Sequence, residues 1–204
     1  NMLINAIFAA VATGGAVIAS QYLGHRDRKK ACEASSQLMV VTAVCALLFT
    51  VLSLAARKPL LSLLFGQIDA DVMDAALTYL TVSALSFPFL ASFNSSSALF
   101  RAMNDSRTPT VVSLGMNVMN LIGNSILIFG MKWGVAGAAI STLLSRVMAA
   151  AVMFALSLNR ERQLYVRPDQ MTRFQPTLIG QILYIGIPSG IENGIFELGR
   201  IVVV

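Results

Sequence analysis

The stretch ASSQLMVVTAVCALLFTVLSLAA, residues 34–56, decides the fold class, because it is long, apolar and free of charged side chains. About 20 helical residues are enough to cross the hydrocarbon core of a bilayer. The whole chain has a matching composition: 56% of its 204 residues are hydrophobic and only 12% are charged, about half the charged share of a soluble domain. This composition excludes intrinsic disorder and argues against a soluble enzyme. The sequence therefore predicts a polytopic membrane protein.

Six apolar stretches are long enough to cross the membrane as helices. They cover residues 1–23, 34–56, 75–100, 108–130, 134–158 and 177–204. The stretches are continuous and do not alternate, and each is too long for a strand of a membrane barrel. The breaks between them fall at glycine, proline or charged residues. The predicted fold class is therefore all-α, a bundle of six transmembrane helices.

The positive charges of the connecting segments divide unevenly between the two sides of the predicted bundle. The first, third and fifth segments contain Arg26, Arg28, Lys29, Lys30, Arg101, Arg107, Arg160, Arg162, Arg167 and Arg173, whereas the second and fourth contain Arg57, Lys58 and Lys132. By the positive-inside rule, segments 24–33, 101–107 and 159–176 are predicted to lie on the cytoplasmic side. The protein itself is predicted to lie in the inner (plasma) membrane. Because aromatic residues are not interleaved with these charges, nucleic acid is not an expected partner.

Features typical of enzymes are missing from the sequence. No Cys/His spacing indicates a metal site, no glycine-rich loop indicates phosphate binding, and no nucleophile–base pair is visible. His25 lies in a basic loop. Cys32 and Cys45 would be about 20 Å apart on one helix, too far for a disulfide. We therefore expect no enzyme, no resident metal and no cofactor.

Three asparagines form a polar stripe on the predicted span 108–130. Asn117, Asn120 and Asn124 fall within about 60° of one another on a helix. An amide in hydrocarbon is costly unless it is paired or faces a wet cavity. The stripe therefore predicts either hydrogen bonds that join helices or a pathway for a cation or substrate.

Charged residues within the spans are the other site candidates. Arg146 lies near the middle of the span 134–158, where insertion costs about 2.5–3.5 kcal/mol, so it is expected to face the bundle and hold a partner, in a structural or functional role. In the last span, Glu197 can pair with Arg200, three residues later. Glu192 has no such neighbour and is the better candidate for a group that responds to protons or cations.

Small residues and prolines predict how two spans pack and bend. Gly186, Gly190 and Gly194 recur every four residues and predict a face for close helix packing. Pro188 is expected to bend that helix, and Pro88 to bend the third span. The hydroxyls that follow Pro88 could line a pathway, but bonding back to their own helix is the favoured interpretation; they belong to Ser92, Ser95, Ser96 and Ser97.

Four short segments resemble one family of transporters. They are GHRDRKKA at 24–31, FRAMNDSRTP at 100–109, GVAGAA at 134–139 and IPSGIEN at 187–193. In that order they resemble the loop after the second helix, the loop between the fourth and fifth helices, and the starts of the sixth and seventh helices of multidrug and toxic compound extrusion (MATE) transporters. Together they span nearly the whole chain.

The resemblance implies a protein of twelve helices in two six-helix lobes, which exports organic compounds by cation-coupled alternating access. Residues 1–158 would then be a partial N-terminal lobe of five helices, 159–176 the cytoplasmic segment between lobes, and 177–204 the truncated first helix of the C-terminal lobe. The sequence starts and stops inside apolar stretches. We therefore expect an internal fragment that does not transport alone, without the family's acidic residue on the first helix.

The resemblance also implies roles for single positions. Asn120 and Asn124 match the fifth-helix pair near the N-lobe cation site, and Thr142 matches a threonine of the sixth helix. Many members have Asp where this chain has Asn124, which leaves the coupling ion, Na⁺ or H⁺, open. Glu192 and Glu197 fall near an acidic position that some members use in the seventh helix.

Three functions remain in view: a cation-coupled exporter, a flippase for lipid-linked saccharides, and a membrane assembly subunit that does not transport. Flippase cavities tend to be rich in Arg and Lys, which bind pyrophosphate. The spans here contain Arg146 and Arg200 beside Glu192 and Glu197, a balance that favours cationic or zwitterionic cargo. The expected partners are a small organic substrate, the lipid bilayer and the remaining helices of the full-length chain.

Overall fold

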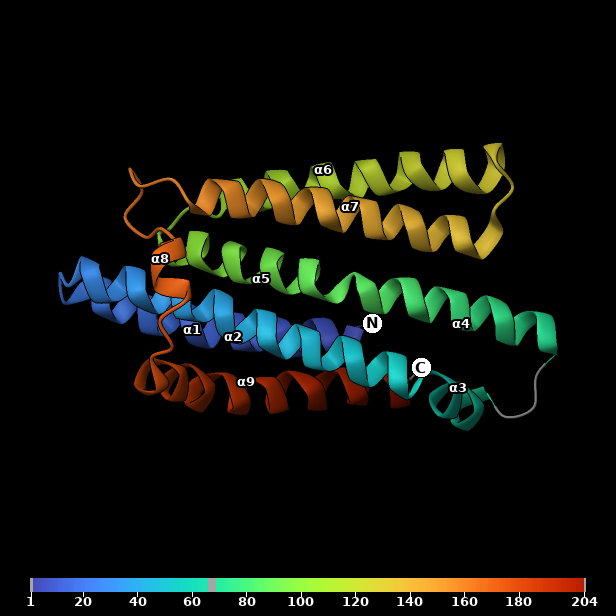
Figure 1. Ribbon diagram of the computed structural model, residues 1–204, viewed down its shortest axis with the longest axis horizontal. Coiled ribbons are helices and arrows are strands. Elements are labelled where there is room, and N and C mark those ends of the chain that lie inside the picture. Colours follow the sequence, from blue (N-terminus) through green and yellow to red (C-terminus); the bar gives the residue numbers. More distant parts are fainter. Residues whose placement is uncertain (1, 66–68, 204) are drawn as a thin grey trace.

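The computed structural model describes residues 2–65 and 69–203, apart from the side chains of residues 2–3, 60, 63–65, 197–198 and 200–203. Its long helices lie side by side along one axis (Figure 1). The elements are α1 (Met2–Gly24), α2 (Arg28–Ala55), α3 (Arg57–Phe65), α4 (Ala70–Leu85), α5 (Phe87–Ala102), α6 (Arg107–Asn124), the π-helix η1 (Ser125–Gly130), α7 (Gly134–Ser157), α8 (Pro168–Met171) and α9 (Pro176–Val203). The predicted all-α fold is confirmed for the described residues.

The apolar helices agree with most of the predicted spans. Four are long and apolar enough to cross a membrane: α1 from Ile4, α2, α6 continued by η1, and α7. The pair α4 and α5 gives a fifth candidate, bent by 41° at Ser86, next to Pro88 as predicted. α9 covers the sixth predicted span as one helix through Pro188. It is less apolar than these candidates over its described residues, and its sequence contains Gln181, Glu192 and Asn193.

Two segments that were expected to be loops contain helices. α3 occupies part of the second connection, and the short α8 lies within the fifth. The predicted loop 24–33 is also shorter than expected, because α2 begins at Arg28. The carboxylate of Asp27 accepts a hydrogen bond of 3.1 Å from the backbone N–H of Lys30 and so caps this helix start.

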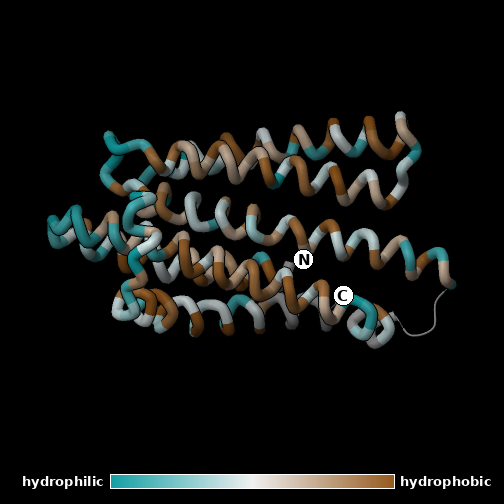
Figure 2. Tube along the Cα trace, in the orientation of Figure 1, coloured by the Kyte–Doolittle hydropathy of each residue, from teal (hydrophilic) through white to brown (hydrophobic). Residues whose placement is uncertain are grey.

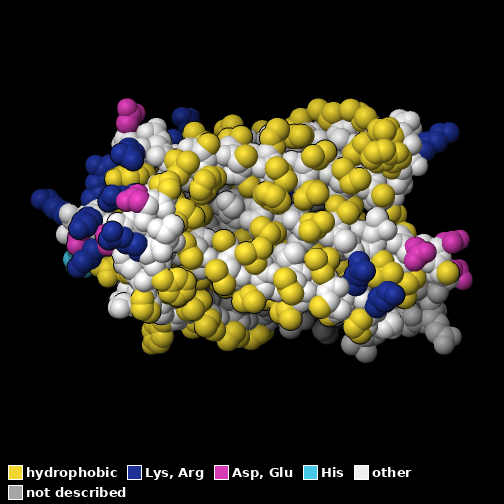
Figure 3. Space-filling view, viewed as in Figure 1, with side chains coloured by type: hydrophobic (Ala, Val, Ile, Leu, Met, Phe, Trp, Pro, Cys, Tyr) yellow, Lys and Arg dark blue, Asp and Glu magenta, His cyan; other side chains and the backbone are white. Residues whose placement is uncertain are grey.

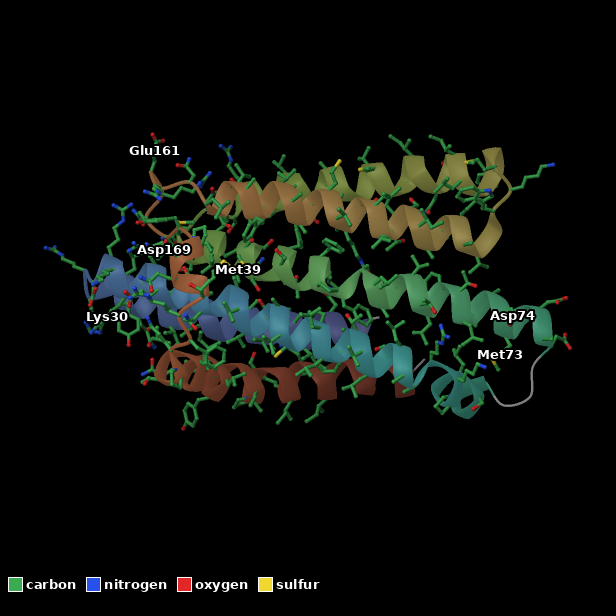
Figure 4. The ribbon with its side chains drawn as sticks, viewed as in Figure 1. Lys30, Met39, Met73, Asp74, Glu161 and Asp169 are labelled. Carbon is green, nitrogen blue, oxygen red and sulfur yellow. The ribbon has the colours of Figure 1, made fainter. Side chains whose placement is uncertain are left out.

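The two ends of the bundle differ in the charge of their side chains. Hydrophilic residues gather at the ends of the helices, while their middles are mostly apolar (Figure 2). Lys and Arg side chains gather at the end beside α8, which we call the basic end (Figure 3). Lys30 and Asp169 lie at this end, and Asp74 lies at the opposite one (Figure 4). The basic end is the side that the positive-inside rule assigns to the cytoplasm.

α1 packs against α2, α5 and α9. Its contact with α9 is close, since a Cβ on Gly14 would lie 2.7 Å from the carbonyl oxygen of Ile182 and 2.8 Å from the nitrogen of Gly186. The predicted packing face of α9 is therefore confirmed at Gly186, and a Cβ on Gly190 would also meet α1, at 3.5 Å. A Cβ on Gly194 would meet none of the described atoms within 4 Å.

Candidate functional site

The α6–α7 hairpin joins the three predicted cation ligands in one chain of hydrogen bonds. The Nδ2 of Asn124 donates to the Oδ1 of Asn120 over 3.2 Å, and the Nδ2 of Asn120 donates to the Oγ1 of Thr142, also over 3.2 Å. The Thr142 hydroxyl in turn donates to the carbonyl of Ala138, one turn earlier in α7, over 2.9 Å. All three side chains are half-buried. The structure therefore brings these three side chains of α6 and α7 together in one hydrogen-bonded group.

Small residues let α6 and α7 approach closely enough for these bonds. A Cβ on Gly123 would lie 2.4 Å from the hydroxyl of Ser141, so a larger residue here would displace this hydroxyl. The Ser141 hydroxyl donates to the backbone carbonyl of Asn120 over 3.0 Å. A Cβ on Gly137 would come within 3.1 Å of the backbone of Leu127. The backbones on both sides of Asn120 and Thr142 are thus held at a fixed separation.

Asn124 carries the one open acceptor of this group. Its Oδ1 atom is buried and accepts no hydrogen bond from the described residues. A buried acceptor left without a donor costs about 1–3 kcal/mol. The hairpin therefore presents one unsatisfied amide oxygen next to an amide oxygen and a hydroxyl that are already in use.

The helix changes its geometry directly after Asn124. η1 runs from Ser125 to Gly130 with π-helical hydrogen bonding. Such segments are rare in proteins and occur often at functional sites. Sequence reasoning missed this feature, because the residues of η1 look like an ordinary apolar continuation of α6.

Asn117 is not part of the group. It is exposed and lines a cavity of about 370 Å³ between α5 and α6, together with Ser97 and Arg101. Sequence reasoning also missed a pair on the neighbouring helices, where the Nδ2 of Asn94 in α5 donates to the Oδ1 of Asn5 in α1 over 2.9 Å.

The hydroxyls of the serines after Pro88 differ in their hydrogen bonding. The hydroxyl of Ser95 lies 2.9 Å from the carbonyl of Ala91 and 2.8 Å from the hydroxyl of Thr42 in α2. The interpretation that these hydroxyls bond back to their own helix therefore holds for Ser95. It is wrong for Ser96 and Ser97, which are buried without a partner among the described residues.

Arg146 has the partner that the sequence could not identify. Its Nη1 donates to the hydroxyl of Ser86 over 2.5 Å. Ser86 is 1% exposed and stands at the break between α4 and α5, where its own hydroxyl donates to the carbonyl of Ser83 over 2.6 Å. The carbonyl of Ala84 is satisfied by the hydroxyl of Thr50 over 3.1 Å. Arg146 thus belongs to the group of side chains that form hydrogen bonds at the bend of the third span.

The acidic candidates lie apart from the asparagine group, on α9. Glu192 is exposed and has no ion-pair partner among the described residues. The side chains of Glu197 and Arg200 lie outside the described residues. The expected Glu197–Arg200 pair therefore stays a prediction.

A family model described as MatE matches residues 1–126. The chain belongs to the MatE family. Two curated relatives match nearly all of this MatE chain. The uncharacterized transporter YisQ of Bacillus subtilis is 32% identical over 98% of the chain and 44% of its own length. The probable multidrug resistance protein NorM of Thermotoga maritima is 28% identical over 97% of the chain and 42% of its own length.

Solved structures show the same fold for this MatE chain. An inward-facing and an outward-facing conformation of a multidrug resistance MATE family transporter of the MOP superfamily each match with a TM-score of 0.85 and 20% identity. Both matches cover 94% of the chain, and 43% and 42% of the solved chains. The MatE chain thus spans less than half the length of its relatives, as expected for a fragment. It is part of a multi-pass plasma-membrane protein from a family of transporters.

Proposed function

We propose that the full-length protein is a secondary transporter that exports small organic, cationic compounds across the plasma membrane, driven by a gradient of Na⁺ or H⁺. Membership in a family of transporters supports the transport role. The observation that carries the coupling is the group formed by Asn120, Asn124 and Thr142, with its open Asn124 Oδ1.

The donor set of this group suits a hard cation. Its atoms are two amide oxygens and a hydroxyl oxygen, and hard cations such as Na⁺ prefer oxygen ligands. Binding would replace the bonds between the three side chains by contacts of their oxygens with the ion. Three neutral oxygens hold a small cation weakly, so a carboxylate from elsewhere in the full-length protein completes the proposed site. If H⁺ is the coupling ion, that carboxylate takes up the proton and donates a hydrogen bond to the Asn124 oxygen.

Two rival functions fit the contacts less well. In an assembly subunit, the asparagines would serve only to hold helices together, and every buried amide atom would be expected to have a partner. The open Oδ1 of Asn124 departs from that expectation. A flippase needs free arginines for pyrophosphate, whereas Arg146 is engaged with Ser86.

Alternating access requires that groups of helices move as units. Similarity is equal to the inward-facing and the outward-facing structures, with a TM-score of 0.85 for each. This supports a transport cycle in which the helices assigned to the N-terminal lobe, α1 to α7, keep their arrangement while the two lobes move relative to one another.

Efflux of a fluorescent organic cation from cells that express the full-length protein tests the proposal. The Na⁺ and H⁺ gradients are collapsed separately, one with a sodium ionophore and the other with a protonophore. Export that stops with one of the two treatments supports coupled transport and identifies the ion. Export that continues after both treatments, or retention equal to that of cells without the protein, would contradict the proposal.

A further inference from the structure

The connection between α7 and α9 packs in a fixed position at the basic end of the bundle. Leu164 and Val166 are 2% and 1% exposed and belong to the same apolar core as α1 and α2. The amide of Gln37, buried in α2, donates to the carbonyls of Gln170 and Arg173 over 3.0 and 2.6 Å. Apolar burial and hydrogen bonds to the backbone thus fix the course of this segment over the start of α2.

Arg28 fixes the first part of the same segment. Its Nε donates to the carbonyl of Gln163 over 3.3 Å, and its Nη2 donates to those of Arg160 and Arg162 over 3.2 and 2.6 Å. Its guanidinium also lies 5.8 Å from the ring centre of Tyr165. Three backbone carbonyls and an aromatic ring therefore hold this cation in place before any ligand binds.

A small basic pocket lies between the start of α2 and the connection between α7 and α9. It has a volume of about 220 Å³ and is lined by Arg28, Lys29, Cys32, Arg160, Tyr165 and Arg167. Four of the six lining residues carry a positive charge and none is acidic. Among the described residues, Arg167 is the one member that pairs with a carboxylate, that of Asp169, at 3.1 Å. Lys29 and Arg160 are exposed and form no ion pair with any side chain that the structure describes.

We propose that this pocket binds a phosphate group, carried by the headgroup of an anionic phospholipid or by free phosphate. Arginine and lysine are the residues that recognise phosphate, through charge-assisted hydrogen bonds. The pocket is smaller than the roughly 300–1,000 Å³ of sites for drug-sized ligands, so it suits a headgroup and not the cargo. It lies at the basic end, the side that the positive-inside rule assigns to the cytoplasm, where the membrane leaflet contains anionic lipids. Because Arg28 and the backbone are already fixed, ordering on binding is confined to exposed side chains such as those of Lys29 and Arg160.

The test compares two pairs of substitutions in the full-length protein, reconstituted in phosphatidylcholine nanodiscs. Lys29→Gln with Arg160→Gln removes two pocket charges. Lys30→Gln with Arg173→Gln removes one charge from each of the same two elements, but outside the pocket. In one arm, phosphatidylcholine is replaced stepwise by phosphatidylglycerol; in the other, inorganic phosphate is added, against sodium chloride of equal ionic strength. The thermal unfolding temperature is measured in both.

We expect the unfolding temperature of the unaltered protein and of the Lys30/Arg173 variant to rise with the ligand. The apparent affinity of the Lys29/Arg160 variant should fall by about 30-fold. A charge-conserving variant, Lys29→Arg with Arg160→Lys, should keep most of the affinity of the unaltered protein. A rise with phosphatidylglycerol identifies a lipid headgroup, and a rise with inorganic phosphate alone identifies a soluble ligand. Equal losses in both charge-removing variants, a rise with sodium chloride of the same size, or no rise in either arm would overturn the proposal.

Discussion

The guanidinium of Arg146 in α7 donates a hydrogen bond of 2.5 Å to the hydroxyl of Ser86, at the break between α4 and α5. A charge within a membrane span is stable only when it has partners in the bundle, so this contact stabilises both the arginine and the bend. A buried donor that loses its partner costs about 1–3 kcal/mol.

We therefore predict that Ser86→Ala lowers the unfolding temperature of the full-length protein by several degrees, measured by thermal denaturation in detergent. The control is Ser145→Ala, since the hydroxyl of Ser145 is buried but donates only within α7, to the carbonyl of Ser141. In a double-mutant cycle with Arg146→Gln, the losses should be non-additive. Equal effects of the two serine substitutions would contradict a special role for the Arg146 contact.

Contact between α1 and α9 gives a second prediction. Gly14→Ala should destabilise the full-length protein, because the added Cβ would lie 2.7 Å from the backbone oxygen of Ile182, and overpacking typically costs about 1–3 kcal/mol. Gly115→Ala is the control, since nothing described lies within 4 Å of its Cβ position and alanine favours a helix by about 1 kcal/mol. Thermal unfolding should separate the two variants in opposite directions. An unchanged unfolding temperature of the Gly14→Ala variant would show that α1 and α9 are not in close contact at Gly14.

We predict that the carboxyl group of Asp105, in the loop between α5 and α6, makes the stability of the protein depend on pH. Hydrogen bonds from the hydroxyl and backbone N–H of Thr108 are the main causes that lower its pKa, with a smaller contribution from Arg162. A lowered pKa in the folded state adds stability above the ordinary value of about 3.9, and this stability is lost as the pH falls through the lowered pKa. Asp105→Asn should therefore destabilise the protein at neutral pH and less so in acid. Glu161→Gln, at an exposed acid of the same end, is the control, and thermal unfolding from neutral pH into acid measures the difference.

How closely the sequence predicted the ends of a helix depends on the physical cause that ends that helix. α7 was predicted at 134–158 and runs from Gly134 to Ser157, because the apolar length required by the bilayer ends at polar residues on both sides. α2 begins at Arg28, six residues before the predicted start at 34. Local capping by Asp27 extends it past the hydrocarbon, and hydropathy carries no information on such an extension.

The pattern of residues alone predicts contacts of the candidate site only where the residues are close in sequence, and Thr142 was assigned to it by resemblance to the family. Asn120 and Asn124 are one turn apart, so a helix alone brings their amides together. The partner of Arg146 is 60 residues away, and the contact depends on how α7 packs against the break at Ser86. The open oxygen of Asn124 depends in the same way on tertiary packing, since it results from which donors happen to lie nearby.

Glu192 gives a prediction that concerns the proposed transport cycle. It is exposed in this part of the molecule and unpaired among the described residues. Glu192→Gln in the full-length protein removes a group that can exchange protons but keeps its size. If Glu192 takes up a proton during transport, efflux by this variant should vary less with pH than efflux by the unaltered protein, measured in vesicles with an imposed gradient. A pH profile identical to that of the unaltered protein would show that Glu192 has a structural role only.

The asparagine group gives the most direct test of coupling. Asn120→Ala removes the link between Asn124 and Thr142, and Asn124→Ala removes the open Oδ1. Both should reduce ion-driven efflux by the full-length protein about tenfold or more while leaving expression nearly intact, since a hydrogen bond between transmembrane helices contributes only about 0.6 kcal/mol on average. Asn117→Ala is the matched control, because Asn117 lies on the same helix but is exposed and outside the group. Efflux is measured over a range of Na⁺ concentrations and pH, with the amount of protein in the membrane determined for each variant. If the Asn120 and Asn124 variants fail to insert, the group holds helices together. If they insert and transport with an unchanged ion dependence, these residues do not bind the coupling ion.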